Sequence, residues 1–144
     1  MIKNTLLENI SVGGQVELSD LNDLAEQGFK TIINNRPDHE AAGQPTHHML
    51  EEATKALGLN YVFIPMTGQI SPDVISKTQQ AFSGHDGPHF AFCASGARST
   101  ILWCFAHVHD LGVDGVLAVA GGGGYDLNHL KFALEAYLEN QAKS

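Results

Sequence analysis

The chain has 144 residues, 43% hydrophobic and 17% charged, and sixteen acidic against eight Lys and Arg residues give a formal charge of −8. This size and composition are typical of a single globular domain, which we expect to span residues 1–144. The negative charge argues against nucleic acid and anionic membranes as partners. No apolar run approaches the roughly 20 residues that cross a bilayer. The N-terminus lacks secretory-signal features, so we expect a cytoplasmic protein.

The first half of the chain alternates predicted helices and strands. Ser19 can cap a helix that runs to Gln27 and ends at Gly28. The β-branched run Phe29–Asn34 predicts a strand that breaks at a turn over residues 35–38. A second helix is predicted from near Thr46 to Gly58, and a second strand covers Tyr61–Pro65.

The second half continues this alternation. The predicted elements, in order, are a helix from Ser71-Pro72 to near Gly84, a strand His89–Cys93, a helix Arg98–Asp110, a strand Val113–Ala120 and, after Gly121–Gly124, a helix from about Asp126 to Asn140. Strands alternating with helices predict an α/β fold with a mostly parallel central sheet flanked by helices.

Chemistry is concentrated in the loop between the strand His89–Cys93 and the helix that follows it. A cysteine at a strand end lies under backbone N–H groups and the positive end of a helix dipole, which favour a thiolate. The guanidinium of Arg98 can hold an oxyanion, and the hydroxyl of Ser99 can donate to the sulfur. The predicted catalytic residues are Cys93, Arg98 and Ser99, and the predicted anion-binding loop is Ala94, Ser95, Gly96 and Ala97.

The pattern Cys-x-x-Gly-x-Arg-Ser at 93–99 resembles the active loops of cysteine-dependent phosphatases and of rhodaneses. Further segments resemble the phosphatase-like domain of the beta-lactamase-hydrolase-like proteins over nearly the whole chain: residues 13–15, 28–40, 61–65, 96–99 and 124–126. The resemblance implies a fold like that of the dual-specificity tyrosine phosphatases. It also implies a covalent intermediate on Cys93, without settling which group is transferred.

Three departures from the phosphatase pattern bear on that question. First, the loop between Cys93 and Arg98 is one residue shorter than in tyrosine phosphatases and has the length found in rhodaneses. Second, Phe92 stands immediately before the cysteine, where phosphatases usually have a histidine. Third, no aspartate follows Pro65 to serve as a general acid. Asp38 and Asp126 are candidate replacement acids, or else a turn former and a helix cap. Arg36 is a possible second anion contact, or else a partner of Glu40 or of an acidic helix.

Sulfane-sulfur transfer through a Cys93 persulfide is therefore the favoured function. The alternatives are a phosphatase acting through a phosphocysteine and an inactive module that binds an anion or phospho-ligand. The expected partners are a small anionic or persulfide substrate and a thiol acceptor or phosphoprotein. We expect no metal and no nucleotide cofactor, because His39, His47 and His48 form no ligand ladder and Gly121–Gly124 lacks the P-loop lysine. Cys104 is expected in the core.

Overall fold

The computed structural model describes residues 3–143 and contains a five-stranded sheet. The strand order is β1-β2-β5-β3-β4, where the strands are β1 (Lys3–Leu7), β2 (Ile10–Gly13), β3 (Thr31–Asn34), β4 (Asn60–Phe63) and β5 (His89–Phe92). Only the β1–β2 pair is antiparallel; the β2–β5, β5–β3 and β3–β4 pairs are parallel. The predicted mostly parallel α/β fold is therefore confirmed.

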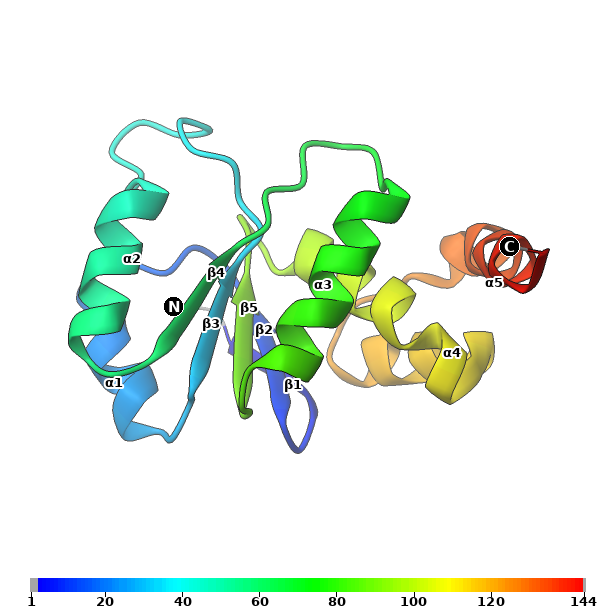
Figure 1. Ribbon diagram of the computed structural model, residues 1–144, viewed down its shortest axis with the longest axis horizontal. Coiled ribbons are helices and arrows are strands. Elements are labelled where there is room, and N and C mark those ends of the chain that lie inside the picture. Colours follow the sequence, from blue (N-terminus) through cyan, green and yellow to red (C-terminus); the bar gives the residue numbers. More distant parts are fainter. Residues whose placement is uncertain (1–2, 144) are drawn as a thin grey trace.

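Helices cover both faces of this sheet (Figure 1). One face carries α1 (Asp20–Glu26) and α2 (His47–Ala56), and the other carries α3 (Pro72–Gly84) and α4 (Ala97–Gly122). A 3₁₀ turn at Asn128–Leu130 leads into α5 (Lys131–Lys143), which packs against α4. The hydroxyls of Thr46 and Ser71 cap α2 and α3 by accepting from backbone N–H groups.

The structure corrects three of the predicted features and adds one hairpin that was not predicted. The strand predicted at Val113–Ala120 is wrong, because this segment is the second half of α4, and its buried Val116 and Ala120 follow helical spacing. Gly112, at φ 77°, kinks the helix just before this segment. The closing helix begins at Lys131 rather than at Asp126. The side chain of Ser19 makes no capping hydrogen bond to α1. The β1–β2 hairpin was not predicted from the sequence.

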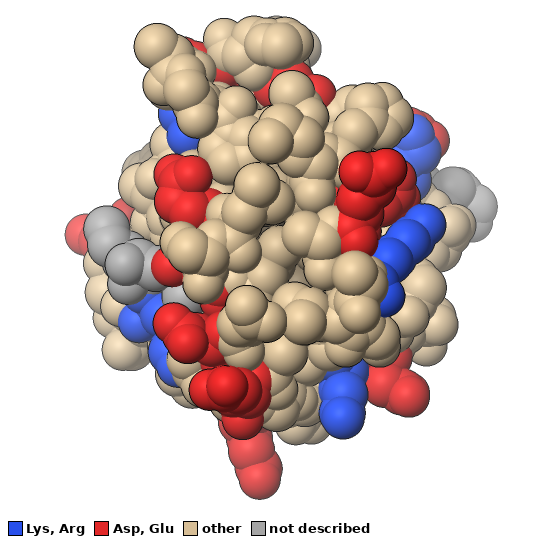
Figure 2. All heavy atoms as spheres, turned by 90° about the vertical axis from the view of Figure 1, so that its left-hand side faces the viewer, with Lys and Arg blue, Asp and Glu red and all other residues tan. Residues whose placement is uncertain are grey.

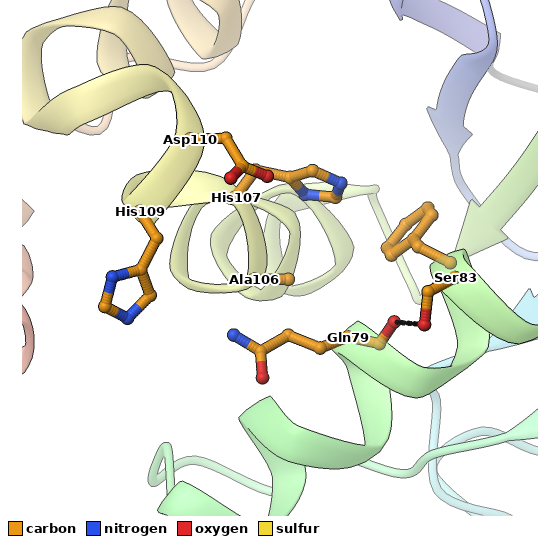
Figure 3. A pocket seen from close by; sticks show the side chains of 7 residues that line it. Gln79, Ser83, Ala106, His107, His109 and Asp110 are labelled. Atoms are coloured by element: carbon orange, nitrogen blue, oxygen red, sulfur yellow. Dashed lines mark hydrogen bonds between the residues drawn. The ribbon is translucent and has the colours of Figure 1, made fainter. Parts of the chain in front are cut away.

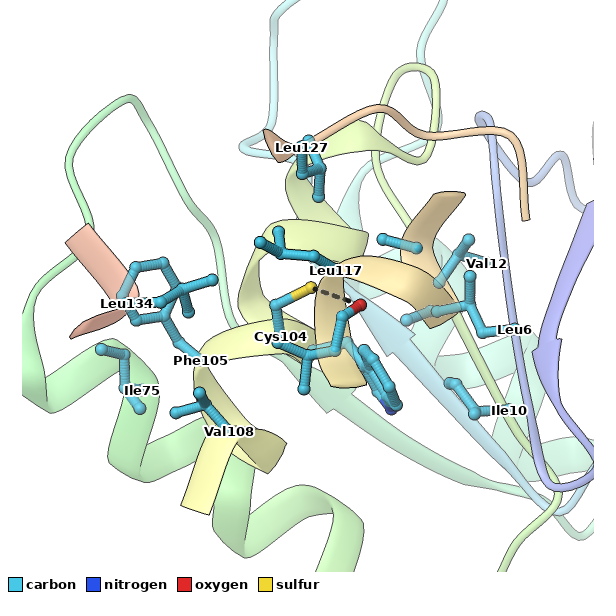
Figure 4. Close-up of a cluster of buried hydrophobic side chains, with 14 of the residues drawn as sticks. Leu6, Ile10, Val12, Ile75, Cys104, Phe105, Val108, Leu117, Leu127 and Leu134 are labelled. Atoms are coloured by element: carbon cyan, nitrogen blue, oxygen red, sulfur yellow. Dashed lines mark hydrogen bonds between the residues drawn. The ribbon is translucent and has the colours of Figure 1, made fainter. Parts of the chain in front are cut away.

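Each face of the sheet buries its own core. Phe90, Phe92 and Ile32 point toward α1 and α2, whereas Val12, Ile33 and Ala91 point toward α4 and its neighbours. Figure 4 shows this second cluster, in which Cys104, Leu127 and Leu134 lie together with residues of the sheet. The segment after α4 is thus packed into the same core as the central strands.

Helix α4 is the one helix among residues 3–143 that is long and apolar enough to cross a bilayer. It is instead part of the core of a soluble domain. The kink at Gly112 interrupts it, and it buries Leu102, Trp103, Cys104 and Phe105 against the sheet and α5.

Candidate active site at the carboxyl end of the sheet

The parallel strands bring their carboxyl ends to one edge of the sheet, where ligand sites of α/β folds form. Cys93 follows β5 there, and its N–H donates to the carbonyl of Gly13 at the end of β2 over 3.3 Å. The residue is 1% exposed. The turn into α4 depends on Gly96, whose φ of 94° is a left-handed conformation that glycine adopts without strain.

The loop stabilises the thiolate form of Cys93. Burial would raise the pKa of this thiol, but hydrogen bonds from the backbone N–H groups of Ser99, Ser95 and Gly96 outweigh it, so that the pKa lies below its ordinary value. The Gly96 N–H lies 3.1 Å from the sulfur. The predicted anion-binding loop thus presents its N–H groups to the sulfur itself, as a nucleophilic cysteine requires.

Ser99 is buried beside the sulfur and contacts both Cys93 and Asn35, the residue that follows β3. Its hydroxyl donates to the Asn35 side-chain oxygen over 2.8 Å, and it also lowers the pKa of Cys93. A hydroxyl carries one proton, so it serves one of these two acceptors at a time. The Asn35 side chain is fixed in turn by donating to the carbonyl of Ile64. Asn35 was not singled out from the sequence.

Arg98 lies in the first turn of α4, and its guanidinium is engaged by a carboxylate of the protein. Nη1 and Nη2 each donate to one oxygen of Glu40 over 2.8 Å, and Nη1 also donates to the carbonyl of Met66 over 2.9 Å. This is the bidentate geometry in which arginine binds carboxylates and phosphates. The pKa of Arg98 is raised by the hydrogen bonds that it donates to Glu40 and by the charge of Cys93.

Arg36, which follows β3, binds the same carboxylate. Its Nε donates to Glu40 over 2.9 Å, and its Nη1 donates to the side-chain oxygen of Gln15 over 2.9 Å. Arg36 therefore forms the ion pair with Glu40 that was predicted as an alternative to an anion contact. Hydrogen bonds from Arg98 and Arg36 lower the pKa of Glu40 to about 2, so this group stays ionised near neutral pH.

The two candidate acids have local structural partners. Asp38 accepts from the backbone and ring nitrogens of His47, and although burial raises its pKa, these contacts lower it overall. Asp126 accepts from the backbone and side-chain nitrogens of Asn128, at the start of the 3₁₀ turn. Asp38 is thus tied to the start of α2, and Asp126 is tied to Asn128 without being the N-cap residue of the 3₁₀ turn, which is Leu127.

Tyr125 closes the reactive loop from the C-terminal side and was missed as a candidate residue. Its hydroxyl donates to the carbonyl of Ser95 over 2.8 Å and accepts from the side chain of Asn4 over 3.0 Å. A methyl group added to Gly96 would lie 2.1 Å from this hydroxyl. The sequence contained one signal, since Tyr125 belongs to the segment 124–126 that carried the family resemblance.

Cys104 and a hollow on the side of the domain lie apart from this chemistry. Cys104 is fully buried in the core as predicted, and burial raises its pKa to about 12. Figure 3 shows a hollow between α3 and α4 lined by Gln79, Ser83, His107, His109 and Asp110. None of these side chains contacts the Cys93 loop, so the hollow does not extend the site.

The mostly parallel sheet, with a buried cysteine in a strand-to-helix loop and an arginine in the first turn of the helix, has the phosphatase-like fold. Solved tyrosine-phosphatase-like structures at 12% or 13% identity share this fold with TM-scores from 0.68 to 0.70. The sequence profile of the beta-lactamase hydrolase-like protein, phosphatase-like domain, matches residues 3–109. The chain therefore belongs to this family.

Individual relatives agree with this assignment. A beta-lactamase hydrolase-like protein of Agrobacterium fabrum is 38% identical over 104 residues, which are 72% of this chain and 24% of that protein. One from Xylella fastidiosa is 31% identical over 138 residues, or 94% of this chain and 31% of that protein. The matched segments thus cover only 24% and 31% of the length of these two relatives. A crystal structure of a suspected phosphatase from Neisseria meningitidis is 26% identical, with a TM-score of 0.81 and coverage of 93% and 96% of the two chains.

Proposed function

We propose that this domain is a cysteine-dependent sulfurtransferase that carries sulfane sulfur on Cys93. The supporting observation is a site that stabilises a thiolate but offers no placed general acid among residues 3–143. Asp38 is held by His47, Asp126 by Asn128, and Glu40 by two arginines. An alkyl phosphate needs such an acid to protonate its leaving oxygen, whereas sulfur transfer between thiolates does not.

The proposed reaction has two steps. The Cys93 thiolate attacks the outer sulfur of a donor; a sulfur–sulfur bond to Cys93 forms, the donor's own sulfur–sulfur bond breaks, and its electron pair leaves with sulfite or a thiolate. An acceptor thiolate then attacks the outer sulfur of the Cys93 persulfide and restores the Cys93 thiolate. The two steps cause no net oxidation and consume no proton. The backbone N–H groups that lower the pKa of Cys93 would stabilise the thiolate as leaving group.

Phosphate monoester hydrolysis is the second candidate, supported by the fold and by the family's description as phosphatase-like. In this reaction the Cys93 thiolate displaces an alcohol from phosphorus, and water then cleaves the phosphocysteine. Without an acid, only esters with good leaving groups such as aryl phosphates would react readily. The proposal places the domain in the cytoplasm, where Cys93 and Cys104, both free here, remain reduced.

A paired turnover assay tests the choice. Thiocyanate formed from thiosulfate and cyanide reports sulfur transfer, and release of an aryl alcohol from an aryl phosphate reports hydrolysis. We expect sulfur transfer that Cys93→Ser abolishes and that Cys104→Ala, its matched control, retains. Phosphate release that depends on Cys93, without thiocyanate formation, would favour the phosphatase; no turnover of either substrate would leave an anion-binding module.

A further inference from the structure

The oxyanion-binding face of Arg98 is already occupied by a carboxylate of the protein. Both terminal nitrogens of the guanidinium bind Glu40 over 2.8 Å, and one of them also binds the carbonyl of Met66. A phosphate or sulfate that reached this arginine in the usual bidentate way would have to displace Glu40. The side chains of Arg98 and Glu40 are 22% and 29% exposed, so water screens their pairing only in part.

The loop after β3 is built to hold Glu40 in this place. The side-chain oxygen of Gln44 accepts from the N–H groups of Glu40 and Ala41, and its nitrogen donates to the carbonyl of Pro37. Asp38 ties the same loop to the first residue of α2 through His47. These contacts fix the backbone on both sides of Glu40, so the carboxylate is presented to Arg98 by a defined turn.

The charges around Arg98 explain why this site disfavours dianions such as phosphate. The positive charges of Arg36 and Arg98 are balanced by the Glu40 carboxylate and the Cys93 thiolate, which leaves no excess positive charge for a dianion. The pKa of Glu40, about 2, means that protonation does not release it near neutral pH. The wider surface adds no attraction, since acidic side chains stand at several places on the face over α1 and α2 (Figure 2).

We propose that Glu40 is the specificity-determining residue of this site, because it occupies Arg98 and excludes oxyanions from the Cys93 loop. Persulfide donors, which present a sulfur atom carried on a thiol, then react without competing for the arginine. Phosphate and other dianions, thiosulfate among them, must first break the Glu40–Arg98 pair, so thiosulfate should be the slower sulfur donor. This inference names the substrate selectivity of the proposed sulfurtransferase site. The role of Glu40 depends on the proposed sulfurtransferase function in one respect, namely that substrates react at Cys93.

The test measures anion binding rather than turnover. Inorganic phosphate is titrated against the rate of Cys93 alkylation by iodoacetamide, and the concentration that halves the rate is compared between wild type and Glu40→Gln. Loss of a charge-assisted contact predicts that phosphate protects the variant at roughly tenfold lower concentration. Glu51→Gln is the matched control, because Glu51 forms an exposed pair with Lys55 on α2 and should leave protection unchanged.

Two further variants keep the test decisive. Glu40→Ala should also strengthen phosphate protection, and adding Arg98→Lys to Glu40→Gln should remove the gain, because lysine lacks the bidentate fork. Unchanged or weaker protection in both Glu40 variants would overturn the proposal and assign Glu40 a role in positioning Arg98. This readout needs no sulfur transfer, so a failure of the proposed function would not be mistaken for a failure of this inference.

Discussion

At the scale of single residues, the state of Cys93 is set by its neighbours. The thiol is buried, which alone would raise its pKa, yet N–H groups of the loop and the Ser99 hydroxyl lower it. The spacing in the sequence predicted that Cys93, Arg98 and Ser99 lie around one loop, and the structure places them there. Glu40 contacts Arg98 across 58 residues, and Tyr125 contacts Ser95 across 30, so neither contact could be inferred from local patterns.

The pH dependence of alkylation tests this account of Cys93. The thiolate is the reactive form, so the rate should rise with pH through a midpoint below that of an ordinary thiol. Ser99→Ala removes a stabilising hydroxyl and should shift the midpoint upward, whereas Ser83→Ala, on the exposed side of α3, should not. Cys104, with its pKa raised to about 12, contributes no signal near neutral pH. Equal midpoints for wild type and Ser99→Ala would contradict the assigned contact.

At the scale of elements, the loop before α4 combines a left-handed glycine with a tyrosine packed over it. Most of the strands and helices could be predicted because their apolar periods and capping residues are local. Val113–Ala120 could not, because its β-branched residues also suit a strand, and only packing against the sheet selects the helix. The β1–β2 hairpin was missed because β1 is an edge strand in which only Leu6 is buried.

Substitution of Gly96 tests the strain argument. Gly96→Ala places a methyl group 2.1 Å from the Tyr125 hydroxyl at a φ of 94°, and we expect it to lower the free energy of unfolding by about 1–3 kcal/mol. Gly121→Ala is the matched control, since its methyl group meets nothing and alanine favours a helix. Thermal unfolding gives both values. Adding Tyr125→Phe should recover part of the Gly96→Ala loss; strictly additive effects would show that the contact is not responsible.

At the scale of the whole molecule, the core joins the strands that carry the Cys93 loop to the C-terminal helix. The family profile matches residues 3–109, yet Leu127 and Leu134 lie in the same buried cluster as Val12 and Ala91. We therefore propose that residues 3–143 unfold as one cooperative unit. The protein's net negative charge and the pairing of Arg98 with Glu40 together make the Cys93 site selective among anions rather than generally attractive to them.

Two substitutions on α5 test this cooperativity. Leu134→Ala removes a fully buried side chain and should cost about 2–5 kcal/mol of stability for the whole domain. Phe132→Ala, 83% exposed on the same helix, should change stability by less than about 0.5 kcal/mol. Denaturation followed by circular dichroism and by Cys93 alkylation should give the same midpoint for each variant. Loss of α5 structure before Cys93 becomes exposed would contradict a single unit.

The mass of the intact protein after incubation with a sulfane-sulfur donor tests the central claim most directly. The account predicts that wild type and Cys104→Ala gain one sulfur atom on Cys93, that cyanide or a thiol removes it, and that Cys93→Ser gains none. An unmodified mass in the presence of both thiosulfate and glutathione persulfide, together with a phosphate adduct or phosphate release that depends on Cys93, would contradict it.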